Sequence, residues 1–102
     1  MTTSFQQLLP SVRECFAQFP ISKAWVFGSF SRGEERTDSD VDFIVEYCKE
    51  DGLSLMTTAR LYRALRNILN RDIDIVEDGY LMPYAEKRAN DEKILIYERE
   101  TA

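Results

Sequence analysis

The chain of 102 residues is long enough for one domain over residues 1–102, and its 18 acidic residues against 13 Lys and Arg give a net charge of −5. This balance argues against a dedicated nucleic-acid-binding protein, because neutralising phosphates needs a basic surface. The absence of histidine excludes Ser-His-Asp and Cys-His catalysis and His–zinc sites, so carboxylates, with a metal ion, must carry any catalysis.

The first half of the chain predicts one helix and two strands. Apolar residues at helical spacing predict a helix over residues 9–18, with Pro10 in its first turn. Residues 24–27 form a short apolar strand, and residues 41–47 form a second strand. The polar segment 28–40 between the two strands contains two glycines and is expected to be a loop, with a short helix if residues after Gly28 begin one.

The second half predicts two helices and a third strand. An amphipathic helix is expected over residues 53–69, a strand over 73–76 and a helix over 83–98. Two turns separate these elements, at Asp51-Gly52 and at Asp78-Gly79. The order of elements predicts an α/β (α+β) fold, with a small mixed β-sheet and helices packed on it.

The cysteines and the lengths of the apolar runs indicate in which cellular compartment the protein is expected. Cys15 and Cys48 fit no metal-ligand spacing, and each lies beside an apolar stretch, which is typical of free core thiols in a reducing cytosol. No apolar run approaches the roughly 18 residues of a membrane span, and no signal peptide is visible. We therefore expect a cytoplasmic protein with no membrane partner.

Two carboxylates lie two residues apart at the start of the second predicted strand. Side chains at this spacing share one face of a strand, so Asp40 and Asp42 point one way while Val41 and Phe43 point into apolar packing. The two carboxylates repel each other, and Mg²⁺ between them would reverse the sign of that interaction. The alternative is a pair of strand-edge carboxylates in water.

Residues 28–33 follow the first strand directly and are suited to hold phosphate. Gly28 allows a ligand to approach the backbone closely, and Ser29 offers a hydroxyl and an N–H. Arg32 adds a cation with fork geometry, and Gly33 ends the segment. The alternative is turn chemistry for the two glycines and Ser29 and a solvated surface charge for Arg32.

A third carboxylate follows on the last predicted strand. Asp72 and Asp74 alternate with Ile73 and Ile75, and Asp74 lies between β-branched residues, where an unpaired charge is costly. This strand should lie beside strand 41–47, which would bring Asp74 toward Asp40 and Asp42. Asp72 is more easily solvated. The alternative is an edge strand with one wet face.

Together these segments resemble the DNA polymerase β-type nucleotidyltransferase superfamily, and specifically its minimal nucleotidyltransferase branch. The matching segments are GSFSRG at 28–33, SDVDFIV at 39–45 and DIDIV at 72–76. Ser31 stands where the family often has Ala. The resemblance implies the polymerase β-type nucleotidyltransferase core as the fold.

The resemblance also implies a role for each matching position. Asp40, Asp42 and Asp74 would be catalytic and would ligate two Mg²⁺ ions, with Asp74 as a candidate general base. Four residues would bind the ATP substrate: Gly28, Ser29, Arg32 and Gly33.

Minimal members of the family look like one half of a two-component system. The other half is a HEPN-domain ribonuclease toxin encoded nearby, and the nucleotidyltransferase is the antitoxin of a type VII-like toxin–antitoxin system. It can act by transferring AMP from ATP to a tyrosine of that toxin. Two alternatives stay open: an antitoxin that neutralises its partner by contact alone, and a nucleotidyltransferase acting on a small molecule or nucleic acid. A homo- or hetero-oligomer also stays open.

Overall fold

A four-stranded mixed sheet forms the centre of the computed structural model, which describes residues 1–49, 52–81 and 83–100. The strands are β1 (Ile21–Phe27), β2 (Val41–Tyr47), β3 (Ile73–Glu77) and β4 (Ile94–Glu98). Their order in the sheet is β3-β2-β1-β4, with β2 antiparallel to β1 and parallel to β3, and with β4 antiparallel to β1. The predicted small mixed sheet is confirmed, and β2 lies at its interior.

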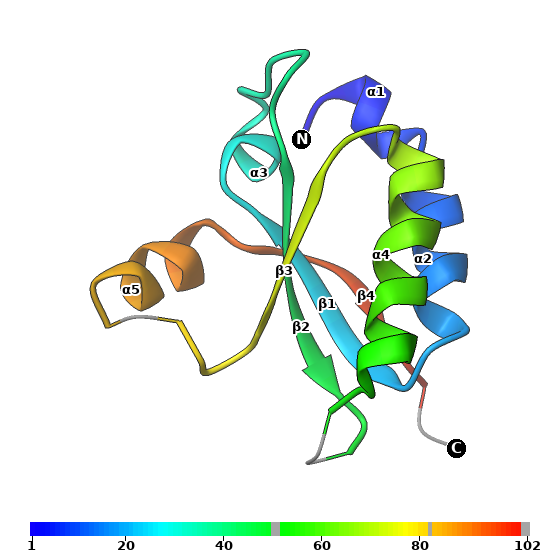
Figure 1. The fold of residues 1–102 in the computed structure, drawn as a ribbon. Coiled ribbons are helices and arrows are strands. Elements are labelled where there is room, and N and C mark those ends of the chain that lie inside the picture. The colour runs from blue at the N-terminus through cyan, green and yellow to red at the C-terminus, as the bar shows by residue number, and fades with distance from the viewer. Residues whose placement is uncertain (50–51, 82, 101–102) are drawn as a thin grey trace.

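Helices lie on both faces of this sheet (Figure 1). They are α1 (Thr3–Gln6), α2 (Leu9–Ala17), α3 (Ser29–Arg32), α4 (Leu55–Leu69) and α5 (Pro83–Glu92). Figure 1 shows α2 and α4 side by side on one face, with α3 and α5 on the other. None of the helices in the described ranges is both long and apolar enough to cross a membrane.

The hydrophobic core lies between the sheet and the pair α2 and α4. Alternate residues of β2, namely Val41, Phe43 and Val45, are fully buried in it. Phe16 of α2 packs edge-on against Phe43, with ring centroids 5.4 Å apart. This alternation leaves the even-numbered residues of β2 on the opposite face, as the sequence predicted.

Helix α4 has a defined beginning and end. The Ser54 side chain accepts a hydrogen bond from the Thr57 amide at the N-terminus, and Asn70 adopts the left-handed conformation (φ 55°) at the C-terminus. Leu61, Leu65 and Leu69 are buried against the core. The predicted helix is confirmed, although it begins at residue 55 rather than 53.

The prediction of one helix over residues 83–98 is wrong in its second half. Helix α5 ends at Glu92, and Ile94–Glu98 form β4, which pairs with β1 from Lys23 to Val26. Residues 94–97 are apolar and include two β-branched isoleucines, which favour a strand once the β1 edge is available. The first strand is also longer than predicted, because it begins at Ile21, and α1 was not predicted.

Three smaller predictions have separate outcomes. The turn at Asp78-Gly79 is confirmed, with Gly79 at φ +90°. Asp51 of the other predicted turn lies outside the described residues. Cys15 is a buried free thiol, but Cys48 is exposed, so the interpretation of Cys48 as a core thiol is wrong.

Candidate active site

The strand register brings two of the three predicted carboxylates side by side. Asp42 on β2 is the register partner of Asp74 on the parallel strand β3, and it is also the partner of Phe27 at the end of β1. Asp40 lies directly before β2, two residues from Asp42, and its charge contributes to the raised pKa of Asp42. The expected proximity of the second and third strands is therefore confirmed.

Asp42 is the electrostatic centre of this group. Burial, followed by the charges of Asp74 and then Asp40, raises the pKa of Asp42 from its ordinary value of 3.8 to about 6. Asp42 is half-buried, whereas Asp40 and Asp74 are exposed. The three carboxylates thus form a site whose negative charge is unfavourable without a cation.

Gly28 directly follows β1 and lies against the Asp42 carboxylate. Its φ of +73° lies in the region that only glycine adopts readily. A Cβ atom at this position would lie 2.9 Å from Asp42 Oδ2, closer than real contacts allow. Glycine is therefore required here both for the backbone turn and for the space beside the carboxylate.

Helix α3 begins directly after Gly28 and offers anion-binding amides. The Ser29 and Phe30 N–H groups lie in the first turn, where an amide has no acceptor within its own helix. The Ser31 hydroxyl is buried and donates to the Gly28 carbonyl over 2.7 Å, which holds this turn. Gly33 ends the helix in the left-handed conformation (φ 71°).

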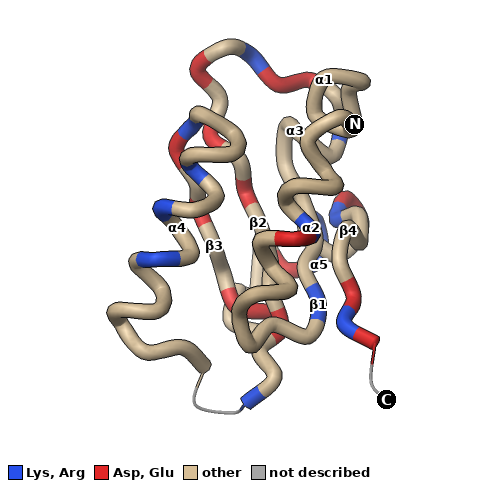
Figure 2. The backbone as a smooth tube through the Cα atoms, turned by 90° about the vertical axis from the view of Figure 1, so that its right-hand side faces the viewer, with Lys and Arg blue, Asp and Glu red and all other residues tan. Residues whose placement is uncertain are grey.

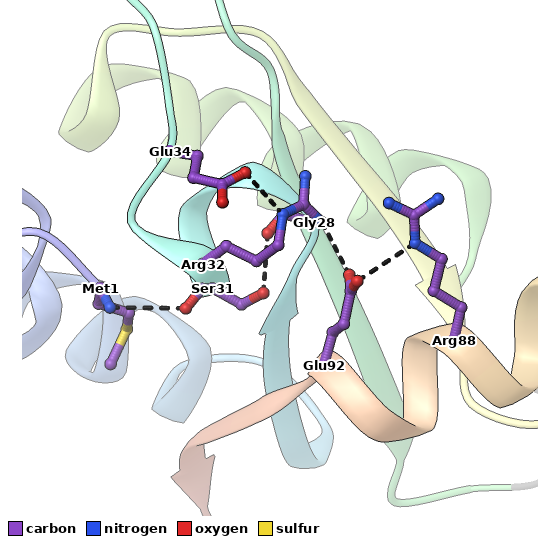
Figure 3. Close-up of polar contacts among 7 residues, drawn as sticks. All are labelled: Met1, Gly28, Ser31, Arg32, Glu34, Arg88 and Glu92. Atoms are coloured by element: carbon purple, nitrogen blue, oxygen red, sulfur yellow. Dashed lines mark hydrogen bonds and ion pairs between the residues drawn. The ribbon is translucent and has the colours of Figure 1, made fainter.

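Arg32 is already engaged by two carboxylates (Figure 3). Its Nε lies 3.1 Å from Glu34 Oε2, and its Nη1 lies 2.8 Å from Glu92 Oε2. The other Glu92 oxygen is 3.2 Å from Arg88 Nε, one turn earlier on α5. The hydrogen bond to Glu34, followed by the interactions with Glu92, raises the pKa of Arg32, while Arg88 and then Arg32 lower the pKa of Glu92.

Sequence reasoning did not identify Glu92 or Arg71 as parts of this region. Arg71 follows α4 and donates through Nη1 to the carbonyls of Arg36 (2.6 Å) and Ser39 (3.0 Å). Its guanidinium also lies 5.0 Å from the Phe30 ring centroid. Arg71 thereby joins the segment before Asp40 to α3. The Arg88–Glu92 spacing of four residues was a visible signal for the ion pair on α5, but not for its contact with Arg32.

Asp72, the less favoured of the two β3 carboxylates, is engaged elsewhere. Its Oδ1 lies 3.3 Å from Arg66 Nη2 of α4, and both side chains are largely exposed. Asp72 therefore faces α4, whereas Asp74 is paired with Asp42. Asp72 lies just before β3 begins, and its pairing with Arg66 rather than strand alternation gives it surroundings different from those of Asp74.

The carboxylate group offers oxygen donors of the kind that a divalent cation prefers. Among the residues that the structure describes, no three Asp, Glu, Cys or His side chains are gathered closely enough to hold a metal ion as they stand. Asp40 and Asp74 are exposed, however, so their side chains can turn toward Asp42 without leaving packed positions. The oxygen donors, the raised pKa of Asp42 and the space kept open by Gly28 fit Mg²⁺.

Comparison with known proteins agrees with this geometry. Residues 11–102 match the family model described as Polymerase beta, Nucleotidyltransferase. The protein adenylyltransferase MntA of Thermococcus cleftensis is 36% identical over 64 residues, which cover 63% of this chain and 63% of that protein. A solved structure described as a candidate minimal nucleotidyltransferase is 34% identical, with a TM-score of 0.73 over 89% of this chain and 91% of that chain.

A more distant structure shares the fold. The complex of tri-AMPylated Shewanella oneidensis HEPN toxin with MNT antitoxin contains a chain with a TM-score of 0.67 at 16% identity, over 92% of this chain and 72% of that chain. The family match spans most of the sequence and includes all three carboxylates and the Gly28 turn. The chain therefore belongs to the polymerase beta nucleotidyltransferase family and is a nucleotidyltransferase.

Proposed function

We propose that the chain is a Mg²⁺-dependent adenylyltransferase that moves AMP from ATP to a tyrosine hydroxyl of a HEPN-domain toxin, and so acts as its antitoxin. The observation that carries the proposal is Asp42, which is paired with Asp74 across β2 and β3 and approached by Gly28 from β1. The similarity to a protein adenylyltransferase MntA, and to an MNT antitoxin in complex with an AMPylated HEPN toxin, supports this acceptor class.

The proposed roles follow from where the residues lie around Asp42. Ser29 and Phe30 amides, with Arg32, would hold the β- and γ-phosphates on the β1 side, and Gly33 supports them by ending α3. Asp74 lies on the β3 side, where it would accept the proton of the attacking hydroxyl. Mg²⁺ ions bound by Asp40, Asp42 and Asp74 would neutralise charge on the phosphates and polarise the α-phosphoryl group.

The transfer itself is an in-line displacement. The acceptor oxygen forms a bond to the α-phosphorus while the bond from that phosphorus to pyrophosphate breaks, and the hydroxyl proton passes to Asp74. The chain contributes by orienting the triphosphate and the acceptor on opposite sides of Asp42, and no histidine is needed.

The test is label transfer from ATP labelled at its α-phosphate to the purified HEPN-domain protein encoded beside this chain's gene, with Mg²⁺ present. We expect labelling of a tyrosine, located by mass spectrometry. Asp42→Asn should lower the rate by about 100-fold or more, because it removes a carboxylate that would hold the Mg²⁺ ions that neutralise charge on the phosphates. Asp91→Asn, an exposed carboxylate on α5, is the matched control and should behave as wild type.

Two results would contradict the proposal. One is the absence of label on the partner with wild-type protein, and the other is equal labelling by Asp42→Asn. If the double variant Asp40→Asn/Asp42→Asn still neutralised the toxin without labelling it, contact alone would be the mechanism.

A further inference from the structure

A groove of about 780 Å³ lies beside the candidate active site and is not used by any role assigned above. It runs between the outer surface of α4 and the segments that lead into β2 and β3. Its lining includes Asp40, Tyr62, Arg63, Arg66, Asn67 and Arg71. Asp40 lines this groove and also belongs to the carboxylate group, whereas Asp42 and Asp74 do not line the groove.

The α4 wall of the groove is basic in a protein that is acidic overall. Figure 2 shows Lys and Arg positions repeated along α4, which the helical spacing of Arg60, Arg63 and Arg66 explains. Only Arg63 and Arg66 of these three line the groove. The opposite wall carries carboxylates, including Asp38 and Asp40, so the groove has a positive side and a negative side.

The cations on the α4 wall are available to a ligand. Arg63 is exposed and makes no ion pair or side-chain hydrogen bond within the described ranges. Arg66 pairs with Asp72 at 3.3 Å, but its side chain is 61% exposed and that of Asp72 is 72% exposed, so an incoming carboxylate can replace this weak pair. Arg71, in contrast, is committed to the carbonyls of Arg36 and Ser39.

The sheet order indicates which substrate reaches the groove. Strands β3, β2 and β1 are consecutive neighbours, so the Gly28 turn lies on one side of Asp42 and Asp74 lies on the other. In an in-line displacement the attacking and leaving oxygens lie on opposite sides of phosphorus. If pyrophosphate leaves toward Gly28, the acceptor enters from the β3 side, and the groove reaches this side at Asp72, the residue before β3, and at Asp40.

We propose that this groove docks an acidic segment of the acceptor protein, with Arg63 and Arg66 binding its carboxylates while the chain that bears the acceptor hydroxyl passes Asp40 and the β3 edge to reach the carboxylate site. The inference rests on the proposed function for the identity of the acceptor. Charge complementarity favours an acidic segment against the basic side of α4. The carboxylates of Asp38 and Asp40 on the other side repel acidic residues, so the acidic part of the docked segment lies away from Asp40.

The test compares charge reversals on one helix. Arg63→Glu should weaken binding of the HEPN-domain protein by about 10-fold or more, measured by calorimetry without ATP, and raise the apparent KM for that protein in the transfer assay. ATP binding by the chain alone should not change. Arg60→Glu, which has the same charge change on the same helix outside the groove, is the control and should bind within about twofold of wild type.

The outcomes separate this inference from the proposed function. Suppose that wild type transfers AMP, but the affinity of Arg63→Glu for the partner equals that of wild type or that of Arg60→Glu. The docking inference then fails and the proposed function stands. If wild type transfers no AMP but Arg63→Glu selectively loses partner binding, docking stands and transfer fails. A single-stranded RNA that binds wild type and is lost by Arg63→Glu, with partner binding intact, would replace the acidic segment as the occupant.

Discussion

The two faces of β2 differ most in its first three residues, where Val41 and Phe43 lie in the core and Asp42 lies in the carboxylate group, although Ile44 on the Asp42 face is also fully buried. Phe43 and its neighbours on one face are fully buried, whereas Asp42 on the other face is half-buried with a pKa raised to about 6. The buried face stabilises the fold, and the acidic face opposes folding when no cation is present. One strand thus makes the scaffold rigid and holds the site in register.

Phe43 offers the largest test of this comparison. Phe43→Ala should lower the free energy of unfolding by about 3–5 kcal/mol, because it opens a cavity beneath α2 beside Phe16. Urea denaturation measures the change. Leu95→Ala on the partly exposed edge strand β4 is the control and should cost far less. A loss below about 1 kcal/mol for Phe43→Ala would contradict the assignment of the core.

A substitution at Gly28 tests the contact between the turn after β1 and the Asp42 carboxylate. Gly28→Ala forces a strained backbone, which costs about 1–3 kcal/mol, and also places a methyl group against Asp42. Gly79→Ala has the same type of strain, at φ +90°, with no atom within 4 Å, so it isolates the backbone cost. We expect both variants to lose stability but only Gly28→Ala to lose ATP binding, measured by calorimetry. Equal effects on ATP binding would argue against the Asp42 contact.

The acidic face predicts an unusual pH dependence in metal-free buffer. The folded pKa of Asp42, about 6, exceeds its ordinary value of 3.8, so between these values the folded state binds more protons than the unfolded state. The favourable contribution of Asp42 to the free energy of unfolding is therefore fully present below about pH 4 and is lost as the pH rises through 6. Asp42→Asn should raise stability above pH 7 by about 1 kcal/mol after allowance for solvent screening, and should give no gain at pH 4.

Thermal unfolding in a chelator across pH measures this effect. Addition of Mg²⁺ and ATP should then stabilise wild type more than Asp42→Asn, because only wild type keeps the ligand carboxylate. Identical melting temperatures for the two proteins at pH 8 without metal would show that Asp42 bears no unfavourable charge.

Glu92 gives the smallest expected effect, because its ion pairs lie near the surface. Glu92→Gln removes the partner that Arg32 and Arg88 share and should lower the melting temperature slightly. The difference should vanish in about 1 M salt, where the screening length is about 3 Å. Asp91→Asn, next to it on α5, should show no change. A large, salt-independent loss would mean that Glu92 has a packing role instead.

Residue spacing within a single strand was enough to predict which side chains of that strand share a face with the candidate site. The alternation around Asp42 and around Asp74 depends only on the period of a strand, and the register of β2 and β3 places these two residues side by side. The Gly28 turn could also be predicted, because glycine after a buried strand indicates a close approach. The residues that such patterns point to are near one another in sequence.

Contacts between distant segments could not be predicted in this way. Residues 94–98 form a strand because β1 has a free edge for them, which no local pattern records. Glu92 meets Arg32, and Arg71 meets the carbonyls before Asp40, only after the chain has folded. Ser31 stands where the family often has Ala, and the contact of its buried hydroxyl, which donates to the Gly28 carbonyl, follows only from the folded turn.

The parallel pairing of β2 and β3 has a consequence for how the molecule folds. Asp42 and Asp74 are separated in the chain by the whole of α4, and a parallel pair cannot close as a hairpin, so this crossover must form first. Contacts between segments so far apart form slowly, because the closing of the intervening loop costs chain entropy. The nucleating contacts are therefore expected within the antiparallel β1–β2 pair and its apolar face, and the carboxylate cluster would assemble late. A nascent chain would thus carry no competent site until α4 has packed.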